Sequence, residues 1–189
     1  LSSAASDVYK RQRLINMEVD KSFVKSRMED ITTQQRYLTR FVNQVVREAC
    51  GELDSLMSTI RTRIKDINNP ITDMELEHFI LNLPALMYYA YECQEAIGIR
   101  EDLAKQEKTQ KYNNSYMSND GNMQERKQQA ELDIITDSLV LNIYVRARRQ
   151  IQNKLDTSTE MLQSLKKIAT RRISENNFNN LTNLPYKED

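Results

Sequence analysis

Apolar residues recur at steps of three and four along most of the chain, which is the spacing of one face of an α-helix. From about residue 23 to residue 67 the pattern is continuous and predicts one long amphipathic helix. Its apolar positions are Leu38, Phe41, Val45, Ala49, Leu53, Leu56, Ile60, Ile64 and Ile67. Because the stripe is narrow and arginines lie outside it, we expect a seam like that of a coiled coil.

The pattern is first interrupted at residues 68–70 (NNP), which end this helix. Thr72 followed by Glu75 has the form of a capping box, in which each residue satisfies a backbone N–H of the other. We therefore expect a second helix over about residues 73–117.

Pro84 lies inside this second helix, and a proline removes one backbone hydrogen bond, so we expect a kink or break near residues 81–83. Residues 118–124 (SNDGNMQ) predict a loop, followed by a third helix over about residues 125–174. Its apolar positions are Leu132, Ile135, Leu139, Ile143, Ala147, Ile151, Leu155, Leu162, Leu165 and Ile168. The Asn-rich segment from Glu175 predicts a frayed or disordered tail.

The composition favours helices and elongation. The 189 residues include only 3 Gly and 3 Pro, with 39% hydrophobic and 29% charged residues. So little apolar content favours long helices that bury a stripe against other copies. We predict an all-α protein in which the second and third helices form an antiparallel hairpin, assembled as a ring-forming or coiled-coil homo-oligomer.

The first residues, LSSAASDVYKRQ, fit no pattern downstream and resemble translated sequencing-adapter read-through. We therefore expect Met17 to be the start and residues 1–16 to be an artefact. The remaining divisions are a long N-terminal amphipathic helix (17–69), a helical hairpin (70–174) and a flexible tail (175–189).

Charge and cysteine use restrict the class of protein. Without the three basic residues and one acidic residue of positions 1–16, 24 basic and 26 acidic residues remain, a net charge of −2. A general polyanion binder is therefore excluded, and any basic site must be local. No apolar run is long enough to span a membrane, no secretory signal is present, and Cys50 and Cys93 lack C-x-x-C spacing. We expect a cytoplasmic protein with reduced thiols.

The candidate site precedes the loop. On a helix Lys105, Lys108, Tyr112 and Tyr116 project within about 80° of one another, with Lys111 at the edge of their stripe. Cations that neutralise phosphates and rings that stack on unpaired bases are typical of single-strand binding. The alternative is a solvated helix end whose lysines favour the helix dipole.

A second basic cluster, Arg146, Arg148 and Arg149, lies in the third helix, where Arg146 and Arg149 are helical neighbours beside Tyr144. It either extends a phosphate track or pairs with the acidic second helix, which has no Lys or Arg between Lys65 and Arg100.

Catalysis and metal binding find no support. Glu75 and His78 make only one Glu-x-x-His, whereas a di-iron bundle needs two and further carboxylates. The chain shows no Gly-rich phosphate loop and no nucleophile with a base, so we expect a protein that is not an enzyme and needs no cofactor. Residues 86–91 (LMYYAY) predict a packing patch.

Four stretches of the second and third predicted helices together resemble a known family. They are ALMYYAY (85–91), the Lys-rich stretch ending in a tyrosine and a Gly-containing loop, AELDIITDSL (130–139) and ATRR (169–172). In residue class and spacing, over about half of the chain, they are similar to the UvsY family of phage recombination mediators. The long helix over residues 23–52 has no counterpart in that family.

The resemblance implies an α-helical ring that binds single-stranded DNA, helps to displace the single-strand-binding protein and loads a RecA-like recombinase. The family's Lys-x-Arg motif falls on Lys111, Tyr112 and Asn113, so that an asparagine replaces the arginine. Tyr116 matches the first aromatic residue of the family, and Met117 replaces the second. Lys105, Lys108 and Arg126 are the cations that would compensate for the missing arginine.

The function predicted from these observations is a recombination mediator of phage DNA, acting in the host cytoplasm. The expected DNA-binding residues are Lys105, Lys108, Lys111, Tyr112, Tyr116, Arg126, Lys127, Arg146 and Arg149. A helical scaffold or structural phage protein that acts through coiled-coil oligomerisation remains the alternative. Adhesion to an anionic membrane is a weaker third, because no helix sets large apolar residues opposite a concentrated basic face.

Overall fold

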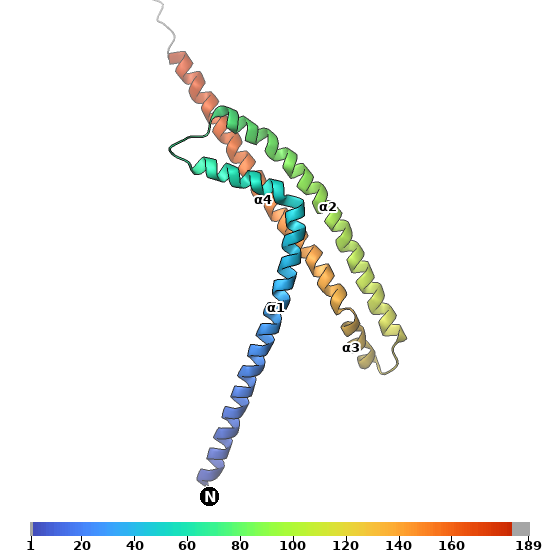
Figure 1. Cartoon of the computed structure of the whole chain (residues 1–189). Coiled ribbons are helices and arrows are strands. Elements are labelled where there is room, and N and C mark those ends of the chain that lie inside the picture. The colour runs from blue at the N-terminus through green and yellow to red at the C-terminus, as the bar shows by residue number, and fades with distance from the viewer. Residues whose placement is uncertain (1, 183–189) are drawn as a thin grey trace, which may run out of the picture. The chain divides into compact units, whose positions relative to one another are not determined.

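Helices account for nearly all of the backbone in a computed structural model, which describes residues 2–182 and, for side chains, residues 25–29 and 31–178 (Figure 1). Within residues 2–182 the elements are α1 (Ser2–Lys65), α2 (Asp73–Ser118), α3 (Met123–Asp133) and α4 (Ile135–Thr182), with no strand. The predicted all-α class is therefore confirmed. The chain divides into two units, residues 1–41 and 42–189.

The first unit is helical from Ser2 onward. Among its described side chains only Leu38 is half-buried, and the others are exposed. The large apolar ones, Met28, Ile31, Tyr37 and Phe41, are each exposed by half or more. At the helical period Met28 and Ile31 lie on one side of the helix and Tyr37 and Phe41 on another, so this unit exposes apolar side chains on more than one side.

The second unit is built on three helices. The part of α1 from Val42 to Ile60 shares one hydrophobic core with α2 and α4. The fully buried side chains Leu53, Ile60, Leu83, Ile151, Leu155 and Leu165 come from all three. α2 and α4 lie side by side and run in opposite directions, which is the predicted antiparallel hairpin (Figure 1). We call this part the three-helix region.

The seam predicted for α1 was only partly right. Ala49, Leu53 and Ile60 are buried as expected, but Phe41 and Ile64 are largely exposed and Ile67 is 92% exposed. The buried positions instead include Val42, Val46, Cys50 and Met57. Between residues 41 and 50 two neighbouring lines on the helix are both apolar, and spacing alone does not decide which one faces the core.

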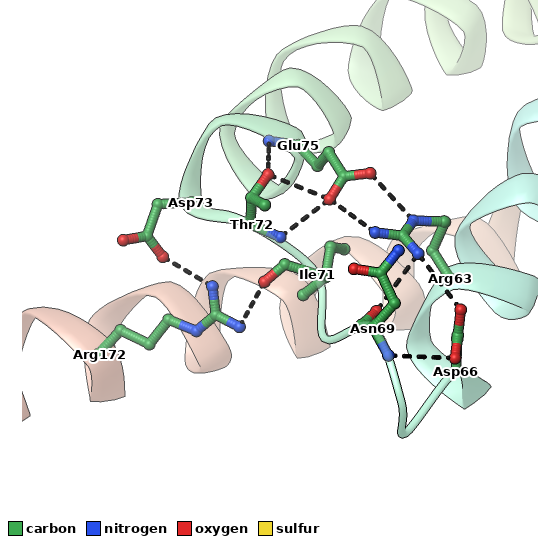
Figure 2. A network of polar contacts seen from close by, with 8 residues as sticks. All are labelled: Arg63, Asp66, Asn69, Ile71, Thr72, Asp73, Glu75 and Arg172. Carbon is green, nitrogen blue, oxygen red and sulfur yellow. Dashed lines mark hydrogen bonds and ion pairs between the residues drawn. The ribbon is translucent and has the colours of Figure 1, made fainter.

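Polar contacts join the end of α1 to the start of α2, a place that we call the corner (Figure 2). The predicted capping box is present, because Thr72 Oγ accepts from the Glu75 N–H and Glu75 accepts from the Thr72 N–H. Arg63 donates two hydrogen bonds of 2.9 Å to the Glu75 carboxylate. These contacts, that of Arg63 first, hold the pKa of Glu75 well below its usual value, at about 2.

The far end of α4 closes the same corner. Arg172 donates to the Asp73 carboxylate at 2.6 Å and to the Ile71 carbonyl at 2.8 Å (Figure 2). A basic residue of α4 thus pairs with the acidic start of α2 within one chain.

Three predicted boundaries need correction. Of the kink or break expected near residues 81–83, the break is absent, because α2 runs through Pro84 as one helix. Pro84 itself is exposed, so the lost hydrogen bond is open to solvent. The predicted third helix is two helices, because the chain leaves helical geometry at Ile134 (φ −98°, ψ 7°). The tail predicted as disordered from Glu175 is helical to Thr182. Residues 183–189 lie outside the described part.

The start of α3 at Met123, before the predicted residue 125, has a clear cause. Asn122 accepts from the N–H groups of Gln124 and Glu125, and Glu125 returns a bond to the Asn122 N–H, which makes a second capping box. Gly121 precedes it with φ 128°, a backbone conformation that side chains disfavour.

Candidate nucleic-acid interface

The candidate site lies at the turn of the hairpin. We define the hairpin tip as α2 from Lys105, the 119–122 turn, α3, and α4 as far as Asp137. Polar contacts hold it together: Ser115 Oγ donates to the Asp133 carboxylate, and Gln129 donates to the same carboxylate at 3.0 Å. These bonds, that of Ser115 first, lower the pKa of Asp133. Ala130 is fully buried where α3 packs on α2.

Two of the predicted residues, Tyr112 and Tyr116, form a ring pair. Their centroids lie 6.3 Å apart and the rings are nearly parallel, with 13° between their planes. Both side chains are half-buried. Sequence spacing had placed these rings on one face of the helix, and the structure brings them together.

Arg126 of α3 completes this cluster. Its guanidinium carbon lies 5.3 Å from the centre of the Tyr116 ring, within the range of a cation–π interaction. Its Nε is buried and has no hydrogen-bond partner among the described atoms. The Arg126 guanidinium is thus placed against the Tyr116 ring, and an arginine from another helix joins the tyrosine pair.

The lysines predicted to bind DNA near the tyrosines fall into two groups. Lys105 is exposed and Lys108 half-buried, and within residues 25–178 neither has an ion-pair partner. Lys111 differs, because its Nζ lies 2.7 Å from the Asp137 carboxylate, a contact that lowers the pKa of Asp137. Lys127 is exposed and 3.9 Å from Glu131.

The predicted lysines and tyrosines lie on the side of α2 that faces the core further along the helix, which their spacing alone did not indicate. At about 100° per residue, Lys105, Lys108, Tyr112 and Tyr116 continue the same line that carries the buried residues of the three-helix region. That line runs through Leu83, Met87, Ala90, Gln94 and Ile97. One side of α2 is thus apolar and buried along the three-helix region and becomes basic and aromatic at the tip.

Arg146 and Arg149 are not part of the tip cluster. Arg146 lies nine residues beyond Asp137, about 14 Å along α4 at the usual rise per residue. Both are exposed, and neither has a partner among the described residues. Arg148, the third residue of the predicted cluster, does pair with α2, at 3.6 Å from the Glu101 carboxylate, which is the expected alternative for this cluster.

Other candidate chemistry is not assembled in the described part of the chain. No group of His, Cys, Asp and Glu there is arranged to hold a metal ion, and His78 contacts Asn82 at 3.0 Å. Burial raises the pKa of the Cys50 thiol to about 11, which suppresses the reactive thiolate. Of the predicted packing patch, Met87 is buried, but Tyr88, Tyr89 and Tyr91 are exposed.

No described helix combines the length and apolarity needed to cross a membrane. Comparisons of the chain with family models, with curated proteins and with solved structures found no match.

Proposed function

We propose that the protein is a recombination mediator that binds single-stranded DNA through the hairpin tip. The observation that carries the proposal is the parallel Tyr112–Tyr116 pair, with Arg126 against Tyr116. It lies on the same side of α2 as Lys105 and Lys108, which have no ion-pair partner among the described side chains. Rings and cations in one line are the chemistry of sequence-independent single-strand binding.

Each group has a distinct role in this proposal. Lys105 and Lys108 neutralise phosphates, and Tyr112 offers a ring to an unstacked base. Arg126 positions Tyr116 and places a positive charge beside the rings. Lys111 contributes after exchanging Asp137 for a phosphate, which costs little because the Lys111 side chain is 50% exposed.

The remaining predicted cations extend the contact beyond the tip. Lys127, Arg146 and Arg149 are exposed and add phosphate contacts along α3 and α4. Several copies on one strand multiply weak individual contacts through effective concentration.

The resemblance to the UvsY family supplies the partners of the proposal. In the host cytoplasm the protein displaces a single-strand-binding protein and loads a RecA-like recombinase, as an oligomer without cofactor or catalytic step. Purified protein should therefore accelerate the replacement of that binding protein by the recombinase on a coated single strand.

The direct test is fluorescence anisotropy of labelled oligo-dT with the full chain, over salt from about 50 to 200 mM, with duplex DNA as comparison. We expect preferential binding to the single strand that weakens with salt. The double variant Lys105→Ala/Lys108→Ala should reduce the slope of log K against log salt by about 1.4, or about 0.7 for each phosphate contact.

The matched control is Lys166→Ala/Lys167→Ala, which removes two exposed lysines of α4 away from the tip. It should leave affinity and slope almost unchanged. Equal losses in both double variants would show non-specific attraction, and an absence of binding by folded protein at micromolar concentration would remove the mediator proposal.

A helical scaffold is the second candidate, and one observation favours it: large apolar side chains are exposed along α2. A scaffold would assemble normally but bind oligo-dT no better with its tip lysines than without them.

A further inference from the structure

α2 carries a second apolar stripe that the core does not use. Met74, Leu81, Tyr88, Ile99 and Leu103 are each between 53% and 80% exposed. At about 100° per residue all five fall within about 60° of one another, along about 45 Å of helix. We call this set the outer stripe.

The outer stripe lies opposite the core side of α2. Its centre is about 180° around the helix from Leu83, Ala90 and Gln94, which are buried against the other helices. Met74, Leu81 and Tyr88 follow one another at intervals of seven, the repeat that packs against another helix. An apolar line of this length is typical of an interaction surface.

The charge around the outer stripe restricts its partner. Between Met74 and Leu103, four acidic residues (Glu77, Glu92, Glu95 and Asp102) lie within about 70° of the centre of the outer stripe at the helical period, and no Lys or Arg does. Another such stripe would bring two acidic surfaces together, which is unfavourable. The fitting partner is a helix with an apolar line and positive charge.

The first unit has these properties. Its Met28, Ile31 and Leu38 share one face of α1, within about 80° at the helical period. Met28 and Ile31 are each exposed by 60% or more. Residues 25–41 carry four basic residues (Lys25, Arg27, Arg36 and Arg40) against Glu29 and Asp30. We call residues 25–41 the arm; its length of about 25 Å fits within the outer stripe.

We propose that the outer stripe of α2 is the docking site for the arm of a second copy of this chain. Met28, Ile31 and Leu38 then pack between Leu81, Tyr88 and Ile99. At the helical period Arg27 lies about 60° and Lys25 about 100° from the centre of that face of the arm, so these two cations meet the carboxylates on and beside the outer stripe. Each copy has one arm and one stripe, so the contact is head-to-tail and generates a ring or a chain of copies.

This docking does not depend on DNA binding, because the lysines and tyrosines of the tip lie on the other side of α2. Loss of either property should leave the other in place.

The test measures the mass of the full chain in solution by sedimentation. Wild-type protein should be oligomeric. Both the stripe variant Leu81→Glu/Tyr88→Glu and the arm variant Met28→Glu/Ile31→Glu should be monomeric, with the helical circular dichroism retained. The control Gln150→Glu/Gln163→Glu, on exposed positions of α4, should keep the wild-type mass.

Mixing the two monomeric variants gives the decisive result. The stripe variant retains an intact arm and the arm variant an intact stripe, so we expect a one-to-one complex with a single docked arm. Pairing of two outer stripes would instead leave the arm variant oligomeric, and docking of an arm within its own chain would leave the wild-type protein monomeric.

Charge exchange provides a second measurement in case the glutamates disturb folding. Lys25→Glu/Arg27→Glu and Glu92→Lys/Glu95→Lys should each weaken assembly at least tenfold, and a mixture of the two should recover most of the loss. A monomeric wild type, an arm variant of wild-type mass, or a failure of both mixtures would overturn the proposal.

Discussion

The three-helix region and the hairpin tip both contain α2 and α4, but the side chains between the helices are mainly apolar in the first and mainly polar in the second. In the three-helix region α2 presents Leu83, Met87 and Ala90 to a third helix, and the side chains there are buried and apolar. At the tip the same side of α2 presents lysines and tyrosines, and the contacts between helices are hydrogen bonds and ion pairs.

The difference teaches how one helix both holds a fold and exposes a site. Apolar burial supplies most of the stability of a helical bundle, so α2 can be anchored along one part of its length. The tip is then stabilised by its attachment to the anchored part and by two capping residues, Asn119 and Asn122. Its side chains remain available for chemistry.

The largest effect should come from the interior of the three-helix region. Leu83 is completely buried, and Leu83→Ala removes its contacts and leaves a cavity, so we expect a loss of about 2–5 kcal/mol in unfolding free energy. Urea denaturation followed by circular dichroism measures it. A loss below about 1 kcal/mol would mean that this side of α2 is not the main anchor.

Overpacking the tip should have a smaller and more local effect. Ala130 is fully buried between α3 and α2, and Ala130→Leu adds volume that the site cannot hold, at a cost of about 1–3 kcal/mol. Hydrogen exchange should show early opening of α3 while the amides of the three-helix region stay protected. Uniform loss of protection would contradict the division into two regions.

The helical periodicity of the sequence was enough to predict the hairpin, because stripes over some forty residues have few other interpretations. It was not enough to predict which side of α1 is buried, because Val42 and Val46 lie on one line along the helix and Val45 lies on the neighbouring one. The break at Ile134 has no proline or glycine to announce it. The early start of α3 does have a signal, since Asn122 and Glu125 stand at capping-box spacing.

The candidate site was predictable in part for the same reason. Tyr112 and Tyr116 are four residues apart, so their proximity follows from the helix alone. The cation over Tyr116 comes from another helix, and the pairing of Lys111 with Asp137 depends on the register of the hairpin. Contacts of that kind require the fold, and no local pattern contains them.

Replacing Tyr112, the ring proposed to stack on a base of DNA, should separate binding from stability. Tyr112→Leu keeps an apolar side chain on the helix but removes a stacking surface, worth about 1–3 kcal/mol per base. We expect the affinity for oligo-dT to fall about 5- to 150-fold, with the salt slope unchanged because no charge is lost. A changed slope would show that the substitution acts by rearranging the lysines.

Acid should weaken the hydrogen bonds and the ion pair that Glu75 makes at the corner between α1 and α2. The folded pKa of Glu75, about 2, lies below its ordinary value of 4.5, so its contribution is complete above pH 4.5 and is lost as pH falls toward 2. Glu75→Gln should therefore lower the thermal midpoint at pH 7 by less than Leu83→Ala does, and the difference from wild type should shrink toward pH 2.

The tip offers the matched measurement for this pH dependence. Lys111 lowers the pKa of Asp137, so Asp137→Asn should show the same direction of pH dependence, detected as increased hydrogen exchange of α3 and the start of α4 at pH 7. An Asp137→Asn effect that grows as the pH falls would contradict the ion pair.

The smallest effect should come from Leu132, which the periodic pattern assigns to the core but which is 60% exposed. Leu132→Ala removes little buried surface, and alanine favours the helix, so the change in unfolding free energy should stay within about 0.5 kcal/mol. Leu155→Ala, at a completely buried position of α4, is the control and should cost about 2–5 kcal/mol. If both substitutions cost the same, Leu132 is covered in solution by another chain. Apolar burial would then stabilise the tip as well as the three-helix region.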